Sequence, residues 1–199
     1  MRNNFCSKIQ TIYTSNPYTI ERLFDSSLYA YDCKSSKRTF FTASDTNKDK
    51  SLIIINKRNN EIIHICIDGG IIKYGLEDYV GDGITRGRCD CMIFDDNKLL
   101  LVEFKMDVEP LTRDKTLWKN YSHAMKQIKD FFIYLKASFL QKGNELHKFY
   151  SDDNIIPIIC MKYNTNVHYR RNVQRNNEKE KFRQETQLKI QTICEYEFL

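Results

Sequence analysis

The stretch RCDCMIFDDNKLLLVEFKM, residues 88–106, decides the expected fold of this chain. Residues 99–102 (LLLV) are apolar at every position, which is typical of a central strand covered on both faces. The run ends in Glu103 and Lys105, which share one face of the strand, while Phe104 points to the other face and into the core. A carboxylate and an ammonium at the end of a buried strand are unfavourable unless they are paired or bind a metal.

The turn DDNK, residues 95–98, sets the register of a hairpin in this stretch. If the hairpin is centred between Asp96 and Asn97, Asp90 lies opposite Glu103. Side chains in such a pair have Cβ atoms about 5 Å apart. Two carboxylates that close repel each other, and a divalent cation between them removes the repulsion and gains hard oxygen ligands. The register therefore predicts a cation site flanked by Lys105.

The flanking sequence predicts helices and strands around this hairpin. Asn16 as a cap, Pro17 and apolar residues at helical spacing predict a helix over 17–31. Strands are expected at 52–56 and 61–67, joined by the turn KRNN, and a glycine-rich connection follows over 68–88. An amphipathic helix is expected over 116–141, with an apolar stripe from Trp118 to Phe139, and then a strand over 155–161 that lies at an edge or starts near Pro157. A polar and basic stretch over 164–187 is loop or helix, and a last strand is expected near 190–198. This order predicts an α/β sandwich with a mixed central sheet.

Bulk composition bounds the class of protein. The 199 residues suit one domain, and 41% hydrophobic and 29% charged residues are typical of a globular protein. No apolar run approaches membrane-spanning length, and the start MRNNFCSKIQ lacks the apolar stretch of a signal peptide, so we expect a cytoplasmic protein without membrane contact. The seven scattered cysteines indicate reduced thiols. A net charge of +5 only mildly favours a polyanionic partner.

Asp90 followed by Glu103-Phe104-Lys105 at the end of an apolar strand resembles the D…(D/E)xK signature of the PD-(D/E)xK nuclease superfamily. The resemblance covers about residues 17–161 and implies that family's αβββαβ restriction-endonuclease-like core, a three-layer sandwich, with residues 164–199 as a basic segment and a final strand. Cys89 stands where the family name has a proline, a departure that does not touch the ligands.

The resemblance also implies roles for individual residues. Asp90 and Glu103 would hold Mg²⁺ (or Mn²⁺) together with the backbone carbonyl of Phe104, and Lys105 would orient or help to deprotonate the attacking water. Some members add a glutamate from the first helix, for which Glu21 is the best candidate. A partial match to a Q-x-x-x-Y motif adds Gln127, which is followed by Phe131 and could orient Lys105 or the water.

Arginines beside the motif and in the basic stretch are candidates for phosphate contacts. Arg86 and Arg88 precede Asp90 directly. Arg170 and Arg171 could grip phosphates while Tyr169 stacks on a base. Glutamates dilute the charge of that stretch, so a solvated helix with pairs at i,i+3 and i,i+4 stays an equal alternative.

Several other side chains have a functional and a plain interpretation. For the pair Cys89 and Cys91, whose alternation puts both opposite Asp90, buried thiols are favoured over a zinc site. His64 is expected to be packed rather than a ligand, and His123, one turn before Gln127, either contacts substrate or fills a helix flank. The acidic residues before Asp90 could complete a metal shell but more often are solvated; they are Asp68, Glu77, Asp78 and Asp82.

Taken together, the sequence predicts a metal-dependent nuclease that hydrolyses phosphodiester bonds of nucleic acid, DNA rather than RNA. A domain of this size would take its specificity from a protein partner or from a homodimer, and a prokaryotic restriction, defence or mobile-element setting fits the Lys-, Asn- and Ile-rich composition. Two alternatives stay open. One is a catalytically silent module of the same fold that binds nucleic acid or a protein, and the other is an interaction subunit that never meets nucleic acid.

Overall fold

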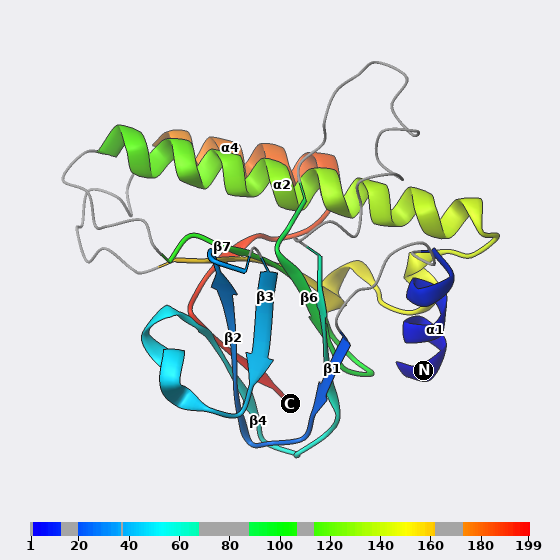
Figure 1. Cartoon of the computed structure of the whole chain (residues 1–199). Helices are drawn as coiled ribbons and strands as arrows, with labels where there is room; N and C mark the ends of the chain where they lie inside the picture. Colours follow the sequence, from blue (N-terminus) through cyan, green and yellow to red (C-terminus); the bar gives the residue numbers. More distant parts are fainter. Residues whose placement is uncertain (1, 13–19, 37, 68–87, 107–113, 162–172) are drawn as a thin grey trace.

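The computed structural model describes residues 2–12, 20–36, 38–67, 88–106, 114–161 and 173–199. These residues form two mixed β-sheets that lie face to face, with helices over the outer face of the larger sheet (Figure 1). The layers are therefore helix, sheet and sheet. A mixed α/β sandwich was expected from the sequence and is confirmed, but its third layer is a second sheet.

The larger sheet has six strands in the order β1-β5-β6-β7-β8-β9. Its strands are β1 (Ile20–Leu23), β5 (Ile62–Cys66), β6 (Cys91–Phe94), β7 (Leu99–Phe104), β8 (Ile155–Cys160) and β9 (Gln191–Thr192). The first four strands in this order pair antiparallel, whereas β7, β8 and β9 pair parallel. Between β5 and β8 the chain thus runs through three antiparallel strands, the helix α2 and a parallel strand.

The smaller sheet has four strands in the order β10-β4-β2-β3. Its strands are β2 (Ser27–Cys33), β3 (Arg38–Thr42), β4 (Leu52–Asn56) and β10 (Glu195–Phe198), and the short 3-10 helix η1 (Asp45–Lys50) connects β3 to β4. The chain leaves this sheet after β4 through a turn at residues 57–61. Asn56 holds that turn, because its buried amide donates to the carbonyl of Asn60 at 2.8 Å and accepts from the amide of Asn60 at 3.1 Å.

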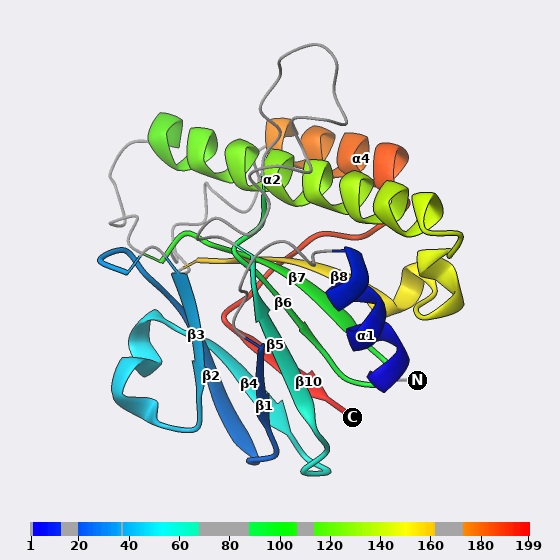
Figure 2. The same ribbon diagram turned by 45° about the vertical axis from the view of Figure 1, so that its right-hand side comes forward.

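Three helices of the described residues cover the outer face of the six-stranded sheet. They are α1 (Arg2–Ile12), α2 (Asp114–Gln141) and α4 (Val173–Thr186), and the 3-10 helices η2 (Leu146–Lys148) and η3 (Asp152–Asn154) lie between α2 and β8. Figure 2 shows α2 and α4 side by side above the sheet. The predicted stripe of α2 is buried from Tyr121 to Phe139, as expected for a helix that packs on a sheet; the side chain of Trp118 lies outside the described residues.

The alternation of β6 and β7 divides the apolar residues between two cores. Met92, Leu99 and Leu101 belong to the core beneath the helices, whereas Ile93 and Leu100 belong to the core between the two sheets. Both faces of β7 are therefore covered, and every residue of this strand is buried. This confirms the central strand predicted from residues 99–102.

The predicted helix over 17–31 was wrong. Residues 20–23 and 27–33 form the strands β1 and β2, and residues 17–19 lie outside the described part of the chain. The apolar spacing there also suits two short strands, whose backbone groups find partners in β5 and in β3 and β4. Pairing between segments distant in sequence has overridden a local helical pattern.

The other predicted strands and the long helix are confirmed, with changes in how they are placed, whereas the predicted glycine-rich connection over 68–88 lies, except for Arg88, outside the described residues. The strands at 52–56 and near 61–67 are β4 and β5, but they enter different sheets. The expected last strand is divided in the same way, into β9 and β10. Part of the basic stretch forms α4, and its residues 162–172 are not described.

β8 is an internal strand, so the expected edge position of Pro157 was wrong. The carbonyl of Ile159 accepts a hydrogen bond from Ile193 on the β9 side, so the nitrogen of Pro157 faces that side as well. Pairing with β9 begins only at Ile158. The proline therefore removes no ladder hydrogen bond.

All seven cysteines are free, as expected for reduced thiols. Within the described ranges, no helix has the length and hydropathy needed to cross a membrane.

Candidate active site

The β6–β7 hairpin has the register predicted from its turn. Phe94 pairs with Leu99 and Cys91 pairs with Val102. The side chain of Asp95 closes the turn, because its Oδ1 accepts the backbone amides of Asn97 at 2.8 Å and Lys98 at 2.7 Å. Local turn chemistry thus fixes which residues of β6 and β7 meet at the other end of the hairpin.

Asp90 lies just before β6 and caps the end of β7. Its backbone amide donates to the carbonyl of Val102 at 2.9 Å, and its Oδ2 accepts the backbone amide of Phe104 at 2.6 Å. The side chain is 8% exposed. The strand alternation breaks here, because Cys89 lies in the core beneath the helices and Cys91 in the core between the sheets. The expectation that the two thiols share a face was therefore wrong.

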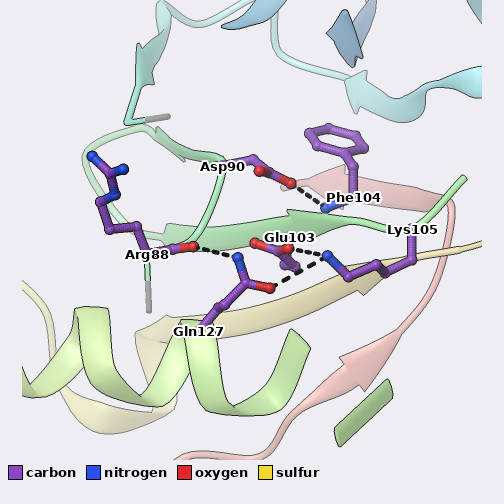
Figure 3. A network of polar contacts seen from close by, with 6 residues as sticks. All are labelled: Arg88, Asp90, Glu103, Phe104, Lys105 and Gln127. Carbon is purple, nitrogen blue, oxygen red and sulfur yellow. Dashed lines mark hydrogen bonds and ion pairs between the residues drawn. The ribbon is translucent and has the colours of Figure 1, made fainter. Parts of the chain in front are cut away.

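Glu103 and Lys105 project toward α2, and Phe104 projects from the opposite face of the strand (Figure 3). Glu103 is 1% exposed and forms an ion pair with the ammonium of Lys105, whose side chain is 18% exposed. The predicted division of faces is confirmed. The ammonium offsets the charge of a carboxylate that would otherwise be costly to bury.

Gln127 of α2 connects this strand end to the segment before β6. Its Nε2 donates to the backbone carbonyl of Arg88 at 3.0 Å, and its Oε1 lies 3.4 Å from Nζ of Lys105 (Figure 3). Because the side-chain nitrogen of Gln127 is bound to the carbonyl of Arg88, the side-chain oxygen faces the ammonium of Lys105. Phe131, one turn further along α2, is fully buried and belongs to the core.

Asp90, Glu103, Lys105 and Gln127 line one cavity of about 320 Å³. The lining is completed by Phe104, Met106 and His123 on this side and by three residues that were not predicted to lie here, Asp32, Lys34 and Lys50. Those three come from the smaller sheet and its connections. Because residues 17–31 were predicted as a helix, the sequence contained no signal that the end of β2 and the end of η1 reach this site.

The cavity brings together oxygen donors suited to a hard divalent cation. Asp90 and Glu103 supply carboxylates from neighbouring strands, and Asp32 adds a third carboxylate to the lining. Among the residues that the structure describes, no group of three or more His, Cys, Asp or Glu side chains is arranged to hold a metal ion. The candidate ligand set is therefore the carboxylate pair and backbone oxygen of β7.

Glu21 lies on β1 opposite His64 and not in the lining of this cavity. Its Oε2 is 2.8 Å from Nδ1 of His64, and Nε2 of His64 is 3.0 Å from the hydroxyl of Thr39. The expected place of Glu21 on a first helix beside the metal was wrong, because the residue belongs to a strand. His64 is fully buried, which confirms the packed interpretation.

The predicted phosphate-binding arginines are only partly described. Arg86, Arg170 and Arg171 lie outside the described residues, as do the acidic residues from 68 to 82. Arg88 contributes its backbone carbonyl to Gln127, but its guanidinium points away from Lys105 and is absent from the cavity lining (Figure 3).

α4 carries the pairs expected of a solvated helix. Arg183 lies 3.9 Å from Glu180, and Glu185 pairs at 2.7 Å with Lys129 of α2. Phe182 is buried against α2, so this helix is fixed to the outer layer.

The pKa values of one thiol and one imidazole near the site are shifted from their ordinary values. Burial, followed by the charges of Glu103 and Asp90, raises the pKa of the Cys89 thiol well above its usual value. Partial desolvation, followed by the positive charge of Lys105, lowers the pKa of His123 below 6.5. Cys89 and Cys91 are both fully buried, as expected for structural thiols.

Comparisons of the chain with family models, with curated proteins and with solved structures found no match.

Proposed function

We propose that this chain is a divalent-metal-dependent nuclease of the PD-(D/E)xK class that hydrolyses phosphodiester bonds of nucleic acid, with DNA as the favoured substrate. One observation carries the proposal: Asp90, Glu103 and Lys105 line the same cavity, with the lysine held between Glu103 and Gln127. A buried carboxylate pair beside an ammonium is the arrangement that the signature requires. The order of β5, β6, β7, α2 and β8 supports the same class.

The residues fit Mg²⁺ or Mn²⁺. Carboxylates of Asp90 and Glu103 are hard oxygen donors, and Mg²⁺ retains several waters, so few protein ligands suffice. The amide of Phe104 faces Asp90, and in an extended strand the carbonyl of the same residue points the same way. Phe104 would therefore add its backbone oxygen to this pair. When bound, the ion would acidify a water and polarise the scissile phosphate.

The side chains around that position have separate tasks. Lys105 donates hydrogen bonds toward the attacking water or a non-bridging phosphate oxygen, and it offsets the charge that grows during attack. Gln127 keeps the ammonium from turning away, because it is itself held by the carbonyl of Arg88. Asp90 ties its carboxylate to the end of β7, so the two acidic groups keep a fixed separation.

The test is cleavage of plasmid, single-stranded DNA and RNA by the purified chain with Mg²⁺ or Mn²⁺, followed by EDTA. We expect cutting that EDTA abolishes and that falls by about a hundredfold to a thousandfold or more in Glu103→Ala and Lys105→Ala. Matched controls are Glu145→Ala and Lys148→Ala, an exposed ion pair at 3.6 Å beyond the end of α2. These controls should cut as the unchanged chain does.

A binding module without catalysis is the second candidate. The carboxylates of Asp90 and Glu103 are already engaged by the amide of Phe104 and by Lys105, an arrangement that a silent descendant of the fold could keep. Nucleic-acid binding that survives Glu103→Ala and Lys105→Ala, with no cutting of any substrate by the folded chain, would favour this candidate over the nuclease.

A further inference from the structure

One side of the cavity is formed by the smaller sheet and its connections, and the residues on that side have no role in the proposed catalysis. Lys34 lies in the turn that follows β2, and Lys50 is the last residue of η1. Both side chains are exposed and both line the cavity that holds Asp90 and Glu103. Two segments distant in sequence thus place ammonium groups beside the same carboxylates.

The α2 side of the cavity is formed by His123 and Gln127. Lys105, just after the end of β7, is the third lysine of the lining. The ammonium groups of the described lining thus come from the smaller sheet and its connections and from the end of β7, and none comes from α2.

A polyanion is the partner that suits the exposed ammonium groups of Lys34 and Lys50. Lysine ammonium groups bind phosphates as point charges and carry no base preference, so they position a nucleic acid without reading it. The cavity lining contains one aromatic residue, Phe104, which is 7% exposed and directed into the core between the sheets. The imidazole of His123 is the other ring of the described lining, and stacking on such a ring tolerates any base.

We propose that Lys34 and Lys50 form a phosphate clamp that holds the nucleic-acid backbone beside the scissile bond, independently of base sequence. This inference rests on the proposed nuclease function and assigns the smaller sheet to substrate binding. Asp32 lies in the same lining and adds a third carboxylate to it.

The experiment measures binding in a Glu103→Gln background with Ca²⁺, so that cleavage does not consume the probe. Two fluorescent oligonucleotides of unrelated sequence are titrated by anisotropy between about 50 and 200 mM salt. Lys34→Gln combined with Lys50→Gln should weaken binding about tenfold or more on both sequences and lower the slope of log K against log salt by about one for each lysine.

The matched control is Lys142→Gln combined with Lys189→Gln, which removes the same charge from exposed positions outside this cavity lining. The control should leave both affinity and slope close to those of the parent. Thermal unfolding checks that all variants are folded, which is expected because the four lysines are exposed.

The outcomes separate this inference from the nuclease proposal. If the unchanged chain cleaves nucleic acid but the Lys34 and Lys50 variant binds with the parental affinity and slope, the clamp is wrong and the nuclease stands. A loss on one sequence alone also overturns the clamp, because it indicates base recognition. If the unchanged chain neither binds nor cleaves any nucleic acid, both proposals fall.

Discussion

A single amide side chain decides how Lys105 is presented. Gln127 donates to the carbonyl of Arg88 at 3.0 Å, so only its oxygen is left to face the ammonium at 3.4 Å. A glutamate in its place would have no hydrogen to donate and would add a negative charge beside Lys105. The orientation of this residue is thus fixed from the segment before β6.

We expect Gln127→Ala to lower the turnover number of the nuclease by about tenfold to a hundredfold, because the lysine loses its alignment. In Gln127→Glu, the added carboxylate cannot donate to the carbonyl of Arg88 and should pair with the ammonium of Lys105 instead, so the turnover number should fall as well. Gln141→Ala, at the exposed end of the same helix, is the control. An unchanged turnover number in both Gln127 variants would contradict a positioning role.

His64 links folding to pH. Burial, which outweighs the raising effect of Glu21, lowers the pKa of this histidine below 6.5 in the folded chain. The unfolded chain therefore takes up a proton at about pH 6.5, before the folded chain does. The contribution to stability is complete above this pH and is lost as the pH falls.

Between pH 8 and pH 5 the free energy of unfolding should thus fall by up to about 1.4 kcal/mol per pH unit from this residue alone. His64→Gln should show a smaller fall across the same range in urea titrations, and the exposed His147→Gln should follow the unchanged chain. Parallel pH dependences of the unchanged chain and His64→Gln would disprove the assignment.

Residues of the site could be predicted from the sequence only where local spacing determines their position. Glu103, Phe104 and Lys105 are placed by strand alternation alone, and Asp90 by the turn that Asp95 closes, so their faces and proximity could be predicted. Asp32, Lys34 and Lys50 reach the cavity only through pairing of β2 with β3 and β4. No local pattern encodes that pairing.

Among the elements, the strongest predictions came from long periodic segments. α2 keeps one apolar stripe over its whole described length, and β7 is apolar at four successive positions. β1 and β2 are short and half-buried, so their apolar residues fit helical spacing equally well. Only their partners in the two sheets decide between the alternatives.

β10 offers a test of this pairing. The carbonyl of Cys194 accepts the amide of Ile53, so by alternation the amide of Tyr196 also faces β4, whereas the amide of Glu197 faces the open edge. Tyr196→Pro should therefore remove a ladder hydrogen bond and destabilise the chain by about 3 kcal/mol.

Glu197→Pro is the matched control and should cost clearly less, since its lost amide has no ladder partner and its ion pair with Lys57 is exposed. Tyr196→Ala measures the part due to the lost ring. Urea unfolding of the three variants separates the effect of the lost hydrogen bond from that of the lost ring. Equal decreases in the free energy of unfolding of the two proline variants would show that the register of β10 is different.

At the scale of the whole molecule, the cavity is balanced in charge. Three lysines and three carboxylates line it, and partial desolvation lowers the pKa of its histidine, which favours the neutral form. A polyanion therefore gains little from the lining alone. A bound divalent cation would give the same lining an excess of two positive charges.

We expect Ca²⁺ to tighten binding of an oligonucleotide to the unchanged chain by about fivefold to tenfold, an effect of about 1 to 1.4 kcal/mol from nearby charges. Glu103→Gln removes one negative charge and should bind more tightly than the unchanged chain in EDTA, yet gain less from Ca²⁺. Anisotropy titrations with and without Ca²⁺ give the dissociation constants of both proteins. If Ca²⁺ tightens binding equally in the unchanged chain and in Glu103→Gln, the negative charge of Glu103 does not contribute to the cation effect, contrary to this prediction.

The division of residues 191–198 between the two sheets has a consequence for biosynthesis. β9 completes one edge of the larger sheet, and β10 lies parallel to β4 beside residues made some 140 positions earlier. A ribosome must therefore translate past residue 198, and release that segment from its exit tunnel, before either layer can close. Until then the two sheets are incomplete, and the lysines of the smaller sheet are not held in position against the acidic pair of the larger sheet. Any cutting activity would therefore begin only after synthesis has passed residue 198.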